Sequence, residues 1–206
     1  NWGASIVWFA RKDRMFTGNE IEEGDSIVGL REKGLRSNGF SLFRKIMQDA
    51  HGEDWHRVEL DGESLAKLAL HPSKIYSKAV VDMFGGFDKE ARVEVHGVAH
   101  ITGGGLPGKI GRVLNFKGYG ARIEDPFEPG KIIKYCQEKG NVSDEEAYKT
   151  WNMGQGMVVI TSNPEEVIEI AKEHGIESKV IGKVVKEPGI LIKSKGLLSS
   201  GELIKF

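Results

Sequence analysis

Residues 157–185 have the sequence MVVITSNPEEVIEIAKEHGIESKVIGKVV, which contains a strand, a helix and a second strand in direct succession. The apolar run 157–161 is typical of a buried strand. The next residues, NPEE (163–166), form a helix-start signal, because asparagine favours the N-cap and proline fits the first turn. Gly175 ends this helix and residues 180–185 return as a strand. The segment therefore predicts a βαβ unit.

Working outward, strands and helices do not alternate regularly along the rest of the chain. The sequence predicts further strands over 5–10, 26–30 and 121–124, and helices over 40–50, 73–84, 129–139 and 143–150, with one more after Gly105. Ser37 or Asn38 is the expected N-cap of the 40–50 helix. Ser73 is expected to cap the 73–84 helix, with Ile75 facing inward. This irregular order favours an α+β fold over regularly alternating α/β.

Composition excludes several classes of protein. The 29 basic and 30 acidic residues give a net charge of -1, which supplies no electrostatic reason for a nucleic-acid partner or an anionic membrane. No apolar run approaches the roughly 18 residues of a membrane helix. The single cysteine, Cys136, rules out an internal disulfide framework and a cysteine-built zinc site, so a reducing cytoplasm is expected.

Glycine-flanked polar loops are the candidate functional positions, and the 27 glycines are nearly twice the usual ~7%. In the loop 34–39, Ser37 and Asn38 stand before a helix whose first N–H groups suit a phosphate or carboxylate. Arg36 adds a bidentate anion contact. The alternative is that Ser37 and Asn38 only cap the helix and that Arg36 is a solvated surface charge.

The run Gly103, Gly104 and Gly105 is a second candidate, because successive glycines cost backbone entropy and allow close approach of a ligand. His100 and Thr102 beside it supply a titratable imidazole and a hydroxyl. The alternative here is a flexible loop with a structural histidine.

A third loop, 152–156, presents Asn152 and bare backbone, or is simply a tight turn that leads into the next strand. His96 precedes His100 by four residues, a spacing of some 13 Å in an extended chain, so no metal pair is expected. No P-loop, nucleophile-elbow or zinc-protease motif occurs.

Four ordered segments carry a resemblance to one enzyme family. They are GDSIVGL with GLRSNGFS (24–30 and 34–41), LHPSKIY (70–76), HGVAHITGGGL (96–106) and WNMGQGM (151–157). Together they resemble the phosphoribosylformylglycinamidine cyclo-ligase family, also called aminoimidazole ribonucleotide synthetases. The match extends over nearly the whole chain.

The resemblance implies a mixed, largely antiparallel sheet flanked by helices, with residues 21–206 forming the family's C-terminal domain. Residues 1–20 would be a remaining strand and connector from an upstream domain that holds Mg²⁺ and ATP and forms the homodimer. The implied reaction uses ATP to activate the formyl-amide oxygen of formylglycinamidine ribonucleotide, after which the amidine nitrogen closes the imidazole ring. Without the upstream domain, the piece alone is expected to turn over no ATP.

The resemblance also implies roles for the loop residues. Ser37 and Asn38 would line the ligand cleft, and Asn152 would support a second wall formed by His100, Thr102, Gly103, Gly104 and Gly105. Arg36 stands where the family has histidine. Arginine is no general base near neutral pH but binds anions, so we favour anion binding at this position.

Two alternatives remain open at the level of sequence. One is a related enzyme in which Arg36 marks another phosphorylated substrate. The other is a domain that only binds a ligand or docks to its other half and catalyses nothing. An upstream Mg²⁺–ATP domain would favour an enzyme over a stand-alone binding module.

Overall fold

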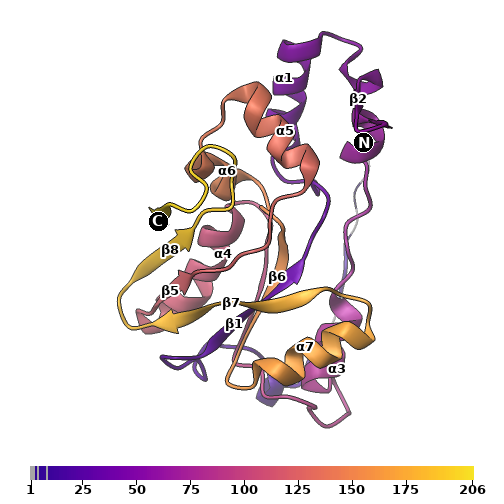
Figure 1. The fold of residues 1–206 in the computed structure, drawn as a ribbon. Coiled ribbons are helices and arrows are strands. Elements are labelled where there is room, and N and C mark those ends of the chain that lie inside the picture. Colours follow the sequence, from indigo (N-terminus) through magenta and orange to yellow (C-terminus); the bar gives the residue numbers. More distant parts are fainter. Residues whose placement is uncertain (1–2, 4, 8) are drawn as a thin grey trace.

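The computed structural model describes residues 3, 5–7 and 9–206 of the chain. The strands of its main sheet are β1 (Ser26–Arg31), β4 (Gly97–His100), β5 (Gly120–Ile123), β6 (Gln155–Thr161), β7 (Ser178–Val185), β8 (Gly189–Lys193) and β9 (Leu203–Lys205). In this part of the chain the strands form one seven-stranded sheet in the order β4-β6-β1-β7-β5-β8-β9 (Figure 1). Neighbouring strands are antiparallel except for β5 and β8, which are parallel. The predicted α+β fold with a mixed, largely antiparallel sheet is confirmed.

The helices are α1 (Phe40–His51), α2 (Leu65–Ala69), α3 (Ser77–Phe84), α4 (Gly105–Leu114), α5 (Lys131–Gly140), α6 (Asp144–Thr150) and α7 (Pro164–Glu173). A small hairpin, β2 (Glu59–Leu60) with β3 (Glu63–Ser64), and the 3-10 turns η1 (Lys12–Arg14), η2 (Trp55–Arg57) and η3 (Asn115–Lys117) complete the described elements. The predicted helices over 40–50, 129–139 and 143–150 are confirmed to within two residues at each end.

The predicted βαβ unit is present as β6, α7 and β7, but the two strands do not touch. β1 lies between them and pairs antiparallel with both. β1 is an interior strand of the sheet, and its residues Ile27, Val28, Gly29 and Leu30 are all buried. A Cβ at Gly29 would lie 2.8 Å from Cγ2 of Ile181, so the neighbouring strand requires glycine there.

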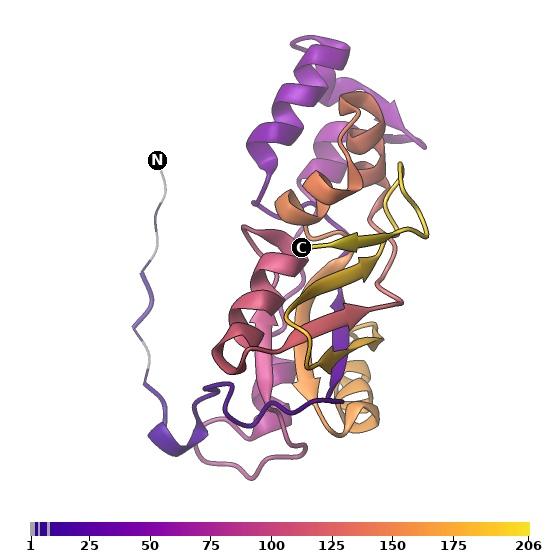
Figure 2. The same cartoon turned by 90° about the vertical axis from the view of Figure 1, so that its left-hand side faces the viewer.

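Helices cover both faces of the sheet, with α4 on one face and α3 and α7 on the other (Figures 1 and 2). Because side chains alternate along a strand, Ile27 joins the core that contains α4 and α5, while Val28 and Leu30 join the core under α3 and α7. The sequence of β1 is therefore a continuous apolar run, because its two faces pack against two different cores.

Two predicted N-caps are wrong. The N-cap of α1 is Gly39, with φ of +71°, and neither Ser37 nor Asn38 makes a capping bond in the described structure. The other helix begins at Ser77, not near Ser73, and Ile75 is 77% exposed. The second error reflects a contact between distant segments. The backbone N–H of Lys74 donates to the Glu32 carboxylate (3.1 Å), so the residues just before α3 are bonded to the loop after β1.

The predicted buried strand over residues 5–10 is also wrong. Among its described residues, Ile6, Val7 and Phe9 are 85%, 99% and 82% exposed, and none belongs to a strand. Trp8 lies outside the described residues. A strand is stabilised by pairing and by an apolar face to pack against, and this segment runs apart from the sheet (Figure 2).

Candidate functional site

The candidate site is built on the loop that follows β1, an interior strand of the sheet. Glu32, the first residue after the strand, is buried, and its Oε1 accepts the N–H groups of Lys33 (3.0 Å) and Gly34 (3.3 Å). Its Oε2 accepts the N–H of Lys74. The Glu32 carboxylate thus ties the 33–36 loop to the segment before α3, and it fixes the backbone from which Arg36 projects.

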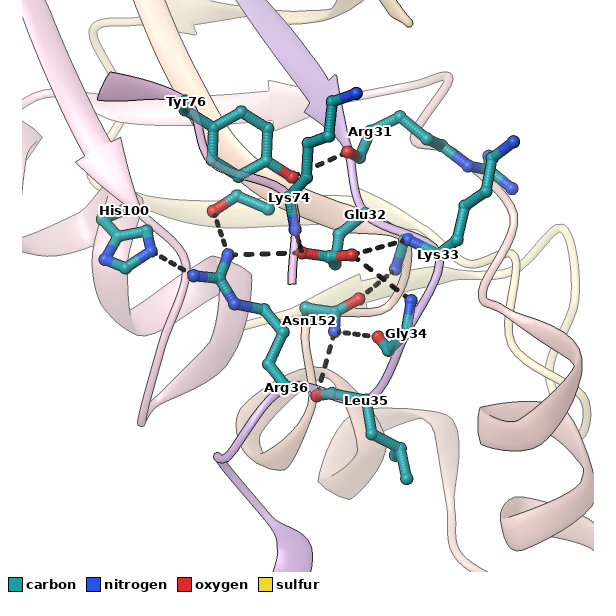
Figure 3. A network of polar contacts seen from close by, with 12 residues as sticks. Arg31, Glu32, Lys33, Gly34, Leu35, Arg36, Lys74, Tyr76, His100 and Asn152 are labelled. Carbon is teal, nitrogen blue, oxygen red and sulfur yellow. Dashed lines mark hydrogen bonds and ion pairs between the residues drawn. The ribbon is translucent and has the colours of Figure 1, made fainter. Parts of the chain in front are cut away.

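The Arg36 guanidinium lies between His100 and the Glu32 carboxylate (Figure 3). Arg36 has a φ of +65°, a conformation that few non-glycine residues adopt, and its side chain is only 11% exposed. Nη1 donates to the carbonyl of Gly156 (3.0 Å) and lies 3.8 Å from Oε2 of Glu32. Nη2 donates to Nε2 of His100. Arg36 is therefore a held, half-buried cation rather than the solvated surface charge of the alternative interpretation.

The contact with Arg36 defines the tautomer of His100. A guanidinium only donates hydrogen bonds, so Nε2 of His100 must carry a lone pair, and the ring proton must be on Nδ1. Burial lowers the pKa of His100 below its ordinary value, and the positive charges of Arg36 and Lys109 lower it further. The neutral imidazole is thus favoured near neutral pH.

The glycine run lies directly against the Arg36 loop. A Cβ on Gly103 would lie 3.0 Å from Nδ2 of Asn38, which places the two loops in contact. Gly104 (φ +92°) is the N-cap of α4, and a Cβ on Gly105 would lie 1.7 Å from the carbonyl oxygen of Tyr148. Gly105 is therefore required for packing α4 against α6, which is a structural reason for one of the three glycines.

Donors remain available at this edge of the site. The N–H of Gly105 bonds to the carbonyl of Thr102 (2.9 Å), whereas the exposed amides of Gly103 and Gly104 have no acceptor within the described part of the chain. Ser37 is exposed and Thr102 half-buried beside them. Amides and hydroxyls grouped near a helix N-terminus can hold an anion.

Asn152 supports the loop from behind. It is buried, and its Nδ2 donates to the carbonyls of Gly34 (2.8 Å) and Leu35 (3.2 Å). Its Oδ1 accepts the N–H of Gly154 (2.8 Å). Both the amide nitrogen and the amide oxygen of its side chain are engaged by the backbone, so Asn152 holds the two loops together.

Sequence reasoning missed Glu32 and Tyr76. The Tyr76 hydroxyl donates to the carbonyl of Arg31 (2.7 Å), and its ring lies 6.0 Å from the Arg36 guanidinium. Burial, together with the charge of Glu32, raises the pKa of Tyr76, so the hydroxyl stays protonated. The LHPSKIY segment contains Tyr76, but nothing in its local pattern shows the contact with β1. Glu32 stands in a charged stretch, REK, that reads as a solvated turn.

The described residues hold no group of three or more histidine, cysteine or acidic side chains placed to bind a metal. No described helix has both the length and the apolar character needed to cross a bilayer. Cys136 is buried, and burial raises the pKa of its thiol to about 12.

Comparison with known proteins identifies the family. Residues 22–194 match the family described as AIR synthase related protein, C-terminal domain. The chain belongs to this family. The family resemblance predicted from four sequence segments is thereby confirmed.

The curated relatives of this AIR synthase related chain include proteins named phosphoribosylformylglycinamidine cyclo-ligase. The one from Methanococcus maripaludis is 40% identical over 87% of this chain and 50% of its own length. The Methanopyrus kandleri protein is 37% identical over 87% of this chain and 49% of its own length, and the Thermococcus kodakarensis protein 38% identical over 94% and 54%. The chain thus spans about half the length of the curated relatives it matches.

Solved structures show the same fold at low sequence identity. Escherichia coli HypE, a hydrogenase maturation protein, superposes with a TM-score of 0.57 at 17% identity, covering 93% of this chain and 52% of that one. PurL from Thermotoga maritima, complexed with FGAR, gives 0.54 at 18% identity, covering 94% and 29%. Thiamine-monophosphate kinase from Stenotrophomonas maltophilia gives 0.55 at 12%, covering 91% and 54%. These likenesses concern the fold alone.

Proposed function

We propose that this chain is the C-terminal part of an ATP-dependent cyclo-ligase that converts formylglycinamidine ribonucleotide to aminoimidazole ribonucleotide in de novo purine biosynthesis. The proposal rests on the family match and on relatives of that name at 37–40% identity. In this reaction the formyl-amide oxygen takes the γ-phosphoryl group of ATP, the amidine nitrogen attacks the same carbon, and phosphate leaves as the ring closes. ADP and phosphate are the co-products.

The observation that carries the site assignment is the meeting of three distant loops around Arg36. Its guanidinium contacts Gly156 and His100, whose loops lie far away in sequence. Such a cation stabilises negative charge on the transferred phosphoryl group or on a bound phosphate. We propose catalytic roles for Arg36 and His100, and substrate binding by Ser37, Asn38, Thr102, Gly103, Gly104 and Gly105, with Asn152 holding the wall.

His100 suits a specific task in this arrangement. With Nε2 occupied by Arg36, its Nδ1–H is the group left to donate. A neutral imidazole near neutral pH can donate this hydrogen bond to an amide oxygen or phosphate without adding a full charge. Movement of Arg36 onto a bound phosphate would release Nε2, and His100 would then be free to take the proton that the amidine nitrogen loses on ring closure.

The residues of this chain do not fit a magnesium–ATP site by themselves. The buried carboxylate near the site, Glu32, is engaged by three backbone N–H groups, and the described residues offer no three-ligand cluster. We therefore assign Mg²⁺ and most of the ATP contacts to an N-terminal domain of the intact enzyme. That domain would also form the homodimer, and the enzyme would act in the cytoplasm.

Arg36 itself favours a second candidate function. Because the resembled family has histidine at this position, an arginine suits a related enzyme that acts on another phosphorylated substrate. HypE and thiamine-monophosphate kinase illustrate that the fold is not limited to one protein. A domain that only binds ligand or docks to its other half is the remaining alternative.

Calorimetric titration with formylglycinamidine ribonucleotide tests the assignment in the chain and in the full-length enzyme. Binding that weakens at least tenfold in Arg36→Ala and His100→Ala, but not in the exposed control Lys193→Ala, would support the proposed site. Ring closure and ADP release are then followed in the full-length protein. Tight binding of a different phosphorylated substrate, with none of this ribonucleotide, would contradict the cyclo-ligase assignment.

A further inference from the structure

A second group of cationic side chains lies beside the candidate site. Figure 3 shows Arg36 and His100 on one side of the Glu32 carboxylate and the side chains of Arg31 and Lys33 on the other. A pocket of about 200 Å³ opens here, and its wall includes Arg31, Glu32, Lys33, His71, Lys74 and Glu177. The loop after β1 thus separates two places at which charged groups gather.

The charge in this pocket is unbalanced. Neighbouring lysines are neutralised, since Lys131 pairs with Glu63 (2.9 Å) and Lys179 with Asp125 (2.6 Å). In the described part of the chain, by contrast, Arg31, Lys33 and Lys74 have no carboxylate partner within ion-pair distance. The wall also contains two carboxylates, Glu177 and Glu32, and Glu32 accepts three backbone N–H bonds. The Lys74 ammonium donates to the carbonyl of Gly175 (2.9 Å), which is uncharged.

Arg31 carries the more specific signal. Its Nε is buried and lacks a hydrogen-bond partner among the described residues. Its guanidinium is held over the ring of Phe127 at 4.9 Å, so the side chain is positioned by stacking rather than by an acid. A buried donor without an acceptor is unfavourable in a native protein unless something supplies the acceptor. An anion in the pocket would supply it.

An adjoining pocket extends this space and suits an organic group. It has a volume of about 350 Å³, shares Arg31, Lys33 and His71 with the first pocket, and adds the apolar side chains of Leu68 and Ile132. Ligand sites generally combine apolar walls with a few fixed polar groups. The two pockets together present cations at one end and an apolar wall at the other.

We propose that these adjoining pockets bind a small phosphomonoester, with the phosphate between Arg31, Lys33 and Lys74 and the organic part against Leu68. Three cationic side chains face two carboxylates in this wall, which leaves a positive excess that attracts an anion, and phosphate oxygens match the planar donors of arginine. The site is separate from the Arg36–His100 cluster, and it does not depend on which reaction the protein catalyses.

Nuclear magnetic resonance titration locates the anion directly. The probes are inorganic phosphate and adenosine 5′-monophosphate, each at constant ionic strength against chloride. Saturable shifts are expected for the Nε–H of Arg31 and for the backbone amides of Lys33, Gly34 and Lys74. Arg31→Gln and Lys33→Ala should each weaken binding at least tenfold, while the exposed control Lys193→Ala should change it less than twofold.

The outcomes separate this proposal from the proposed function. His100→Ala should leave phosphate binding in this pocket unchanged even where it abolishes binding of the ribonucleotide substrate. Shifts confined to the amides of Gly103 and Gly104, or equal binding by Arg31→Gln and Lys193→Ala, would overturn the proposal. Equal affinity for phosphate and adenosine monophosphate would overturn the part assigned to the Leu68 pocket. Thermal unfolding of Arg31→Gln and of Lys33→Ala shows whether each variant remains folded.

Discussion

Arg36 and His100 constrain one another's protonation. The arginine is always charged and only donates, so it stabilises the neutral form of the imidazole at Nε2. Glu32 holds the loop on which Arg36 stands, and Gly156 accepts from the same guanidinium. The protonation of His100 thus depends on Arg36, which is itself held by Glu32 of its own loop and by the carbonyl of Gly156 in β6.

Replacing Arg36 by methionine should raise the pKa of His100. The nearby positive charge is removed, but burial, the larger cause of the lowered pKa, remains, so the value should stay below the ordinary 6.5. Titration of the His100 ring proton by nuclear magnetic resonance measures the change, with the exposed His56 as internal control. An unchanged midpoint would show that Arg36 does not act on His100 electrostatically.

The same pKa shift makes stability depend on pH in a defined direction. Because the folded state lowers the pKa of His100, the unfolded chain binds more protons as the pH falls through 6.5, and the free energy of unfolding decreases. In Arg36→Met this decrease should be smaller, as measured by urea unfolding between pH 7 and pH 5. A steeper acid dependence in the variant would contradict the sign of the effect.

Glu32 should be far more important for stability than its position in a charged stretch suggests. Glu32→Ala leaves three backbone donors without their acceptor and removes the carboxylate that lies 3.8 Å from Arg36, and we expect a loss of about 3 kcal/mol or more in the free energy of unfolding. Glu32→Gln keeps one acceptor oxygen and should lose less. Denaturant unfolding measures both against Glu53→Ala, an exposed control expected to change little.

At the scale of elements, apolar periodicity in the sequence correctly predicted strands and helices that bury an apolar face. The strand at 26–30 and the helices over 40–50 and 164–173 follow from apolar spacing, because each packs one face or both against a core. At the start of α6 the Ser143 hydroxyl accepts the N–H of Glu146 (3.2 Å), which is half of a capping box, whereas the Glu146 side chain bonds to Thr150.

What the sequence could not show were contacts between distant elements. Its glycine-rich loops indicated Arg36, His100 and the Gly103 run, and the structure brings them together. Local patterns did not reveal the bond from Lys74 to Glu32 or the bond from Tyr76 to Arg31, each of which joins residues more than forty positions apart. The predicted start of α3 was wrong for a related reason, since the segment before Ser77 is bonded to the distant Glu32 carboxylate through the N–H of Lys74.

Asp144, the first residue of α6, should hold the β8–β9 connection in place. Its buried carboxylate accepts from Gln137 (2.8 Å), from the Ser194 hydroxyl (2.5 Å), and from the N–H groups of Leu198 and Ser199 (both 3.0 Å). Asp144→Ala is expected to lower the free energy of unfolding by about 3 kcal/mol and to expose the 194–201 amides to hydrogen exchange. Asp144→Asn, which keeps one acceptor, should lose less.

The pKa of Asp144 gives an independent check. Burial acts to raise it, but the hydrogen bonds from Ser194, Leu198, Gln137 and Ser199 outweigh burial and leave it below the ordinary 3.8. The stabilisation is therefore present above pH 3.8 and is lost as the pH falls through the lower, folded-state value. Acid unfolding should begin at higher pH in Asp144→Ala, and identical acid transitions would contradict this account.

On the scale of the whole molecule, we propose that the domain begins near residue 21. Ile21 is buried, and the family match runs over residues 22–194. We propose that residues 1–20 connect this domain to the rest of a longer enzyme. The exposure of Ile6, Val7 and Phe9 supports that division, although Phe9 makes one edge contact with the exposed Phe87 (5.4 Å between ring centroids).

Replacing Ile6, Val7 and Phe9 together by serine tests the division. Because these side chains are 82–99% exposed, the change removes little buried apolar surface, and the free energy of unfolding should stay within about 0.5 kcal/mol of the parent chain. Val158→Ala, a smaller truncation in the buried β6 strand, should cost about 2 kcal/mol or more. In the full-length enzyme the same triple variant should lower stability or domain association, because a connector packs against its upstream partner. A loss above 1 kcal/mol in the 206-residue chain itself would place the segment inside the domain and move the boundary toward the N-terminus.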